Sequence, residues 1–193
     1  MVDDTRNKII AVASKLFGRY GFYKTSMDEI AKIARKAKGS LYYHFTDKKE
    51  LFRVVVSTEM ENFKTKMSEV VNDNSLTPTQ KIKKYLLLRM EILNEAVNYH
   101  ETLKADFFEH FDFIDDLRTD LDNWEKQQIG KMFEEGIKTG EFEPAGDLTI
   151  LMDVFMMVLK GLEIPFFIQG NYAKYSPYFD DMLNILIKGV SKN

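Results

Sequence analysis

Apolar residues recur every three or four positions along nearly the whole chain of 193 residues, which is the spacing of one face of an α-helix. Ile9, Ala13 and Phe17 follow this spacing near the start of the chain, and Met182 and Leu186 follow it near the end. The alternation of apolar and polar residues that is typical of a β-strand never reaches a useful length. The sequence therefore predicts an all-α fold of about nine helices.

Glycine, proline and capping residues divide this pattern into separate helices. Ser26 and Glu29 have the spacing of a capping box, so a helix is expected to begin there. Gly21 and Gly140 can end the helices that precede them, because glycine readily takes a left-handed conformation. The expected helical ranges are 5–20, 26–34, 38–45, 48–71, 79–97, a kinked stretch over 101–111, 114–138, 146–169 and 176–190.

Charge is distributed unevenly along the chain. Residues 1–53 carry a net charge of +6, whereas residues 54–193 carry −9, which gives the total of −3. A basic segment can attract phosphate groups, and an acidic one is repelled by them. The charge pattern alone is equally compatible with a nucleic-acid-binding segment and with an ordinary solvated surface of mixed charge.

Three features predict a soluble, cytoplasmic protein. The chain has no cysteine, which excludes disulfides and thiolate metal sites. Its first residues, MVDDTRNKII, place acidic side chains before any apolar run, unlike a signal peptide. The most apolar stretch, 148–168, contains Asp153, Lys160, Glu163 and Pro165, whose charges would be costly in a membrane. We expect this stretch to be a buried helix.

A capped helix, a brief turn and a short aromatic-rich helix occur within residues 26–45, and these are the parts of a helix-turn-helix. Leu41 and Phe45 are spaced to face the other two helices. The residues left facing outward are Lys38, Gly39, Ser40, Tyr42, Tyr43 and His44. A phenol ring can contact a thymine methyl group and its hydroxyl can bond a phosphate, so an exposed tyrosine pair favours DNA binding. The alternative is that both tyrosines pack against the helix 48–71.

The segment Thr25-Ser26-x-x-x-Ile30-Ala31, followed by KGSLYYHF at 38–45, Lys48 and Leu51, resembles the DNA-binding segment of TetR-family transcriptional regulators. The resemblance implies a helix-turn-helix DNA-binding domain over 1–47 and a larger helical ligand-binding and dimerisation domain over 48–193. It further implies that the bases or phosphates of DNA are contacted by Thr25, Lys38, Gly39, Ser40, Tyr42, Tyr43, His44 and Lys48.

The turn before the third helix departs from the pattern of that family. It reads Arg35-Lys36-Ala37, where a glycine, an apolar residue and a serine or threonine cap are usual. Arg35 would then have to adopt a left-handed conformation, and Lys36 occupies the position of an apolar side chain. Ala37 cannot cap the helix, which costs about 1 kcal/mol.

The resemblance also implies a small-molecule pocket framed by the fourth to eighth helices. The candidate lining residues are Phe63, Met67, Tyr85, Arg89, Phe107, Trp124, Gln128 and Phe155. Aromatic and methionine side chains at helical spacing are usually part of a core, which is the default interpretation of each one. A mostly apolar lining would favour an apolar or aromatic ligand. Arg89 could meet an anionic or carbonyl group, or it could point to solvent.

The last two helices carry more apolar surface than one chain needs. The resemblance implies that they pair with their copies in a homodimer, through Leu151, Val158, Leu162, Phe179, Met182, Leu183 and Leu186. Two recognition helices about 34–36 Å apart would read successive major grooves of a palindrome. These features predict a repressor of a palindromic operator that a small hydrophobic ligand releases.

Two other classes of function are open to a chain with this sequence. The acidic cluster Glu101, Asp106, Glu109, His110 and Asp112 could suggest a metal-dependent enzyme. However, the Glu-x-x-His spacing of di-iron bundles, a glycine-rich phosphate loop and a nucleophile motif are all missing from the sequence. We therefore expect no enzymatic activity, metal or cofactor. A structural or cell-division factor that binds DNA without any ligand is the remaining alternative.

Overall fold

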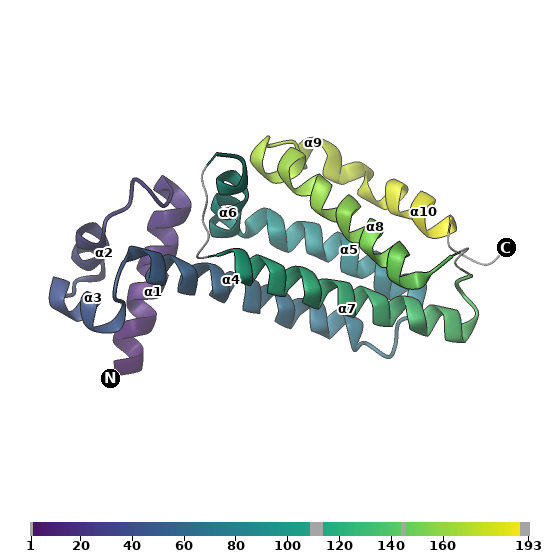
Figure 1. Cartoon of the computed structure of the whole chain (residues 1–193), viewed down its shortest axis with the longest axis horizontal. Coiled ribbons are helices and arrows are strands. Elements are labelled where there is room, and N and C mark those ends of the chain that lie inside the picture. Colours follow the sequence, from purple (N-terminus) through teal and green to yellow (C-terminus); the bar gives the residue numbers. More distant parts are fainter. Residues whose placement is uncertain (1, 109–113, 144–145, 190–193) are drawn as a thin grey trace. The chain divides into compact units, whose positions relative to one another are not determined.

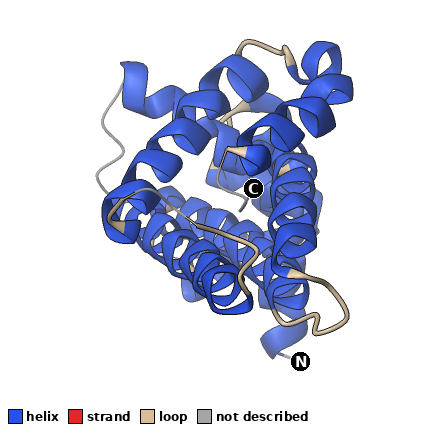
Figure 2. Cartoon of the chain, turned by 90° about the vertical axis from the view of Figure 1, so that its right-hand side faces the viewer, coloured by secondary structure: helices blue, strands red, loops and turns tan. Residues whose placement is uncertain are grey.

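The computed structural model describes residues 2–108, 114–143 and 146–189, and within these ranges the chain is helical with no β-strand (Figures 1 and 2). This confirms the expected all-α class. Nine of the described α-helices have seven or more residues, and a tenth is a single turn. The helices are α1 (Val2–Tyr20), α2 (Met27–Ala34), α3 (Lys38–His44), α4 (Lys48–Val71), α5 (Pro78–Glu95), α6 (Val97–Phe108), α7 (Asp115–Thr139), α8 (Leu148–Glu163), α9 (Tyr172–Tyr175) and α10 (Phe179–Lys188).

Packing divides the chain into two compact units. The first unit contains Met1–Asn62 and Ala96–Leu117, and the second contains Phe63–Glu95 and Arg118–Asn193. Helix α4 begins in the first unit and ends in the second. The limits 1–47 and 48–193 predicted from the sequence describe functional domains rather than packing units, and they stay a prediction.

The first three helices enclose a small apolar core in the first unit. Ile9 and Phe17 of α1, Ile30 of α2 and Leu41 of α3 are all fully buried. The Phe17 ring packs edge-on against the ring of Phe52 on α4, with 5.0 Å between their centres. This core fixes α3 so that only one side of it is covered.

Helix α6 also belongs to the first unit, which the sequence did not predict. The Asn98 side-chain amide, on α6, donates to Glu59 Oε1 on α4 (2.6 Å) and to Ser14 Oγ on α1 (3.1 Å). A side chain at Gly18 would clash with Val97, because a Cβ there would lie 2.6 Å from a Val97 methyl carbon. The first turn of α6 is therefore fastened closely to α1 and α4.

The C-terminal helices differ from the expected ranges because of Pro165. The helix expected over 146–169 is α-helical only to Glu163, and Ile164–Ile168 forms a π-helical turn. Proline has no N–H group to donate to the preceding turn, which interrupts the α-helical bonding. The final helix, expected from residue 176, instead begins with the short α9 and a 3-10 turn at Ser176–Tyr178 before α10.

Candidate nucleic-acid interface and apolar cavity

The turn between α2 and α3 takes the unusual form that its sequence predicts. Arg35 has a left-handed backbone with φ 55° and ψ 46°, and its N–H donates to the Lys32 carbonyl at 3.2 Å. The Lys36 ammonium group donates to Thr5 Oγ1 of α1 at 3.0 Å, so this lysine fastens the turn by a hydrogen bond instead of by apolar packing. Ala37 is the N-cap of α3 and provides no side-chain hydrogen bond.

The uncapped start of α3 gives a stability prediction. Ala37 is exposed, with φ −67° and ψ 145°, which threonine adopts readily. We expect Ala37→Thr to be more stable than Ala37→Val by about 1 kcal/mol, because the two side chains have nearly the same shape and only threonine can accept a helix N–H. Urea denaturation measures this difference. Equal midpoints for the two variants would show that the α3 N–H groups are already satisfied.

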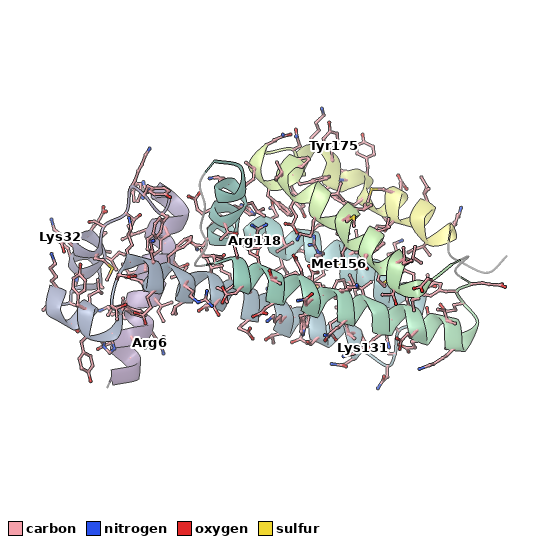
Figure 3. All side chains as sticks on the ribbon, in the orientation of Figure 1. Arg6, Lys32, Arg118, Lys131, Met156 and Tyr175 are labelled. Atoms are coloured by element: carbon pink, nitrogen blue, oxygen red, sulfur yellow. The ribbon has the colours of Figure 1, made fainter. Side chains whose placement is uncertain are left out.

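Helix α3 is anchored on one side and exposed on the other. Leu41 is fully buried and Phe45 is 1% exposed, whereas Tyr42 is 44% and Tyr43 is 78% exposed. Arg6 of α1, labelled in Figure 3, places its guanidinium carbon 5.3 Å from the centre of the Phe45 ring and so covers the anchored side. The alternative in which both tyrosines pack against α4 is therefore wrong.

The rest of the expected reading surface is also accessible. Lys38 and Gly39 are exposed, and Ser40 and His44 are half-buried. A Cβ at Gly39 would have no neighbour within 4 Å, so another molecule can approach the backbone there. The His44 ring lies edge-on to the Tyr43 ring, with 5.1 Å between their centres.

A hollow at the start of α2 brings together four of the predicted DNA-binding residues, namely Thr25, Lys38, Tyr42 and Lys48. It is also lined by Tyr23, Lys24, Ser26, Met27 and Asp28. Sequence reasoning missed Tyr23 and Lys24, although their place directly before a capped helix was a signal. Lys38 forms an ion pair with Asp28 at 2.7 Å, and this hydrogen-bonded contact raises the pKa of the Lys38 ammonium group.

Two predicted phosphate-binding residues point their polar groups into the protein. Thr25 is 1% exposed, and its hydroxyl donates to the carbonyl groups of Gly21 (2.9 Å) and Leu16 (3.3 Å). The Lys48 ammonium group donates to the carbonyls of Phe22 (2.9 Å) and Thr25 (3.1 Å), and partial burial lowers its pKa. Both side chains hold the loop between α1 and α2, and their contacts with phosphate stay a prediction.

Most of the candidate ligand-binding residues lie in the core of the second unit. Phe63, Met67, Tyr85 and Arg89 are at most 2% exposed, and Gln128 is 8% exposed. Trp124 and Phe155 are half-buried; the Trp124 ring lies edge-on to Phe63, and the Phe155 ring lies edge-on to Phe133. The side chain of Phe107 is outside the described residues.

Arg89 is held by two buried carboxylates. Its guanidinium group donates to Glu125 of α7 at 2.9 Å and to Glu163 of α8 at 2.6 Å. The Tyr85 hydroxyl donates to Glu125 at 3.1 Å. Burial raises the pKa of the Glu125 carboxyl and of the Tyr85 phenol. The alternative in which Arg89 points to solvent is therefore wrong, and its guanidinium group already has anionic partners.

A cavity of about 340 Å³ lies among α5, α7, α8 and α10 in the second unit, and its lining is almost entirely apolar. Among the described residues, Phe155 is the one ligand candidate that lines it. Six of the predicted dimer-interface residues line it as well, namely Leu151, Val158, Leu162, Phe179, Met182 and Leu183. The other lining residues are Ile82, Leu86, Met90, Phe133, Phe142, Val154, Leu159 and Ile187.

The predicted dimer interface needs a correction at two positions. Phe179 is 5% and Leu183 is 2% exposed, so both lie inside the single chain because α10 turns this stripe towards α5. Val158 is 49% exposed, and Leu151, Leu162 and Met182 are half-buried. The side chain of Leu186 is outside the described residues.

The described side chains contain no group of three or more histidine, cysteine, aspartate or glutamate residues positioned to hold a metal ion. Of the acidic cluster considered in the sequence, Glu109, His110 and Asp112 lie outside the described residues. A membrane-spanning helix, long and apolar enough to cross a bilayer, was also not found in the described ranges.

Comparison with known proteins assigns the helix-turn-helix. The family model described as "Bacterial regulatory proteins, tetR family" matches residues 9–55, which include the whole of α2 and α3. The chain belongs to the TetR family. The resemblance seen in the motif from Thr25 to Leu51 is thereby confirmed. TetR-family proteins are transcriptional regulators that bind DNA, and this is the general function of the chain.

Similarity to known regulators extends over nearly the full length. The chain is 23% identical to the HTH-type transcriptional regulator QacR of Staphylococcus aureus over 97% of this chain and 98% of that protein. A solved transcriptional regulator from Cytophaga hutchinsonii is 24% identical, with a TM-score of 0.76 over 95% of this chain and 97% of that one. The solved SmeT–triclosan complex has the same TM-score at 15% identity, covering 98% of this chain and 93% of that one. These structures show that the fold is shared.

Proposed function

We propose that the protein acts as a homodimer that recognises a palindromic operator through α3 of each copy. The observation that carries this proposal is the exposure of Tyr42 and Tyr43 on a helix whose other side is anchored by Leu41 and Phe45. Aromatic rings held rigidly in this way can meet thymine methyl groups in the major groove. Two copies related by a two-fold axis would present two such helices to successive grooves. DNA binding also leads us to expect a cytoplasmic protein.

Lys38 is the best-placed cation for a backbone phosphate. Its ammonium group is exposed at the edge of the hollow and lies 5.9 Å from the centre of the Tyr42 ring. Its ion pair with Asp28 is also exposed, so a phosphate can compete for it at little cost.

The role of Lys38 can be measured by the salt dependence of binding. We expect Lys38→Gln to weaken binding to every duplex and to reduce the slope of log affinity against log salt by about 0.9. Lys138→Gln is the matched control, because Lys138 is an exposed lysine in the last turn of α7. A slope that is unchanged by Lys38→Gln would mean that Lys38 contacts no phosphate.

The regulatory part of the proposal is that a small apolar ligand binds the cavity among α5, α7, α8 and α10 and releases the repressor from its operator. An almost wholly apolar lining favours such a ligand. SmeT, whose fold this chain shares, was solved with triclosan. Helix α4 is one continuous helix from Lys48 to Val71, so it can carry a tilt from the second unit towards the DNA-binding helices. The ligand can act only by binding the released state more tightly than the DNA-bound state.

Selection of bound fragments from genomic DNA tests this function directly. We expect one or a few palindromes near promoters, whose complexes dissociate when an apolar compound is added. Hundreds of scattered sites, insensitive to every compound tried, would instead support a structural or cell-division factor. A protein that selects no sequence at all would overturn the proposal.

A further inference from the structure

The wall of the apolar cavity is also an outer surface of the chain. Val154 and Val158 of α8 line the cavity and are nevertheless 50% and 49% exposed. Ile150 and Met157 lie on the same helix, are 64% and 68% exposed, and do not line the cavity. An apolar ligand in the cavity would therefore be separated from solvent by little more than the two valine side chains.

The exposed face of α8, defined by Ile150, Val154, Met157 and Val158, carries no charge. The neighbouring charged side chains bond instead with α7, because Asp153 pairs with Lys126 and Lys160 pairs with Asp122. One turn further along, Gly161 leaves open space where a Cβ would have no neighbour within 4 Å. A partner helix can therefore approach this face closely and without meeting an ionic group.

A second copy of the chain fits this face better than another partner does. Large exposed apolar patches on soluble proteins mark interaction sites. An uncharged apolar stripe is self-complementary about a two-fold axis, because identical copies bring no like charges together. The proposed binding to a palindrome needs such a pair. Helix α10 extends the apolar surface with Ile185, which is 72% exposed and also outside the cavity lining.

We propose that the second copy covers this α8 face and closes the cavity, so that the ligand site is complete only in the dimer. This inference rests on the proposed function, which places an apolar ligand in the cavity of a dimeric regulator. In a single chain, the ligand, Val154 and Val158 would stay partly in contact with water. In the dimer the same apolar surface is removed from water, which favours binding in proportion to the area buried.

Ligand binding and dimer formation then become linked. If dimerisation raises the affinity for a ligand by a certain factor, the ligand raises the affinity between the two copies by the corresponding factor. A ligand can thus change the arrangement of the DNA-binding helices by acting on the interface between copies as well as within each chain.

The test compares a monomeric variant with the wild-type dimer, using the uncharged fluorescent probe N-phenyl-1-naphthylamine. Met157→Glu places a charge on the α8 face without altering the cavity lining, and its exposed position should leave the fold intact. We expect this variant to sediment as a monomer with unchanged helical circular dichroism and to bind the probe at least tenfold more weakly. In the wild type, saturating probe should lower the dimer dissociation constant by at least tenfold.

Two controls make the comparison specific. Met157→Leu keeps the face apolar and should behave as the wild type in both measurements. Ile137→Glu adds the same charge at a 39% exposed position on α7 and should remain a dimer that binds the probe. If Met157→Glu disrupts folding, Ile185→Glu on α10 replaces it in the same measurements.

The outcomes separate this inference from the proposed function. Monomeric Met157→Glu that binds the probe with wild-type affinity would overturn the shared site and leave the ligand cavity in place. A Met157→Glu variant that still dimerises would also overturn it, because the interface would then lie elsewhere. A wild-type dimer that binds no apolar probe would instead overturn the ligand cavity of the proposed function, and the shared site with it.

Discussion

Replacing Tyr42 and Tyr43 together by alanine is expected to reduce affinity for the selected operator by a factor of about 10³, towards the level of non-specific DNA. Both rings project from α3 into solvent, so their loss removes contacts with base edges and leaves the core formed by Leu41 and Phe45. The variant should therefore keep its helical circular dichroism and its thermal midpoint. Fluorescence anisotropy with labelled operator and scrambled duplexes measures both affinities.

A double phenylalanine variant at the same two positions is the matched control. It retains the rings and removes only the hydroxyl groups, so it should preserve contact with thymine methyl groups and lose any hydrogen bond to a phosphate. We expect its operator affinity to lie between those of the wild type and the alanine variant. If the alanine variant bound the operator as tightly as the wild type, α3 would not be the reading helix.

The DNA-binding helices could be predicted from the sequence because their determinants are local. Leu41 and Phe45 are one helical turn apart, and this spacing alone decides which side of α3 is anchored. The left-handed backbone of Arg35 could likewise be predicted, since the turn length leaves no other conformation to the residue that ends α2. The pattern of the family supplied the function of the exposed side.

The directions of Thr25 and Lys48 could not be predicted in the same way. Whether a hydroxyl or an ammonium group faces DNA or the protein depends on which carbonyl groups lie nearby. Those carbonyls belong to the loop between α1 and α2, whose path no periodic pattern specifies. Sequence reasoning therefore identified the neighbourhood correctly and left the role of each polar group undecided.

The ligand region was the least predictable from the sequence. A stripe of aromatic and methionine residues has the same spacing whether it packs into a core or lines a cavity, and here Phe63 and Met67 pack into the core. The cavity depends on how α8 and α10 pack around α5, which is a relation between segments far apart in the chain. Arg89 illustrates the same difficulty, because its partner Glu163 is 74 residues away.

Replacing Arg89 by leucine is expected to destabilise the protein by about 3–5 kcal/mol, which is the usual cost of leaving buried charges without their partner. Arg89, Glu125 and Glu163 are each at most 2% exposed, so water cannot replace the guanidinium group. Urea denaturation at pH 8 measures the loss. Lys83→Leu is the matched control on the same helix, because its ion pair with Asp180 is partly exposed and is expected to be worth less than about 1 kcal/mol.

The same loss should depend on pH in a definite direction. Burial raises the pKa of the Glu125 carboxyl, so the folded protein binds this proton more tightly than the unfolded chain does. Stability then falls as the pH rises through the folded pKa, and it is recovered as the pH falls. Without the guanidinium group this effect grows, so Arg89→Leu should lose less stability at pH 5 than at pH 8. Adding Glu125→Gln should restore part of the loss at pH 8 and weaken the pH dependence, because an amide needs no counter-charge. If Arg89→Leu were equally destabilised at both pH values, lost packing rather than unpaired charge would be the cause.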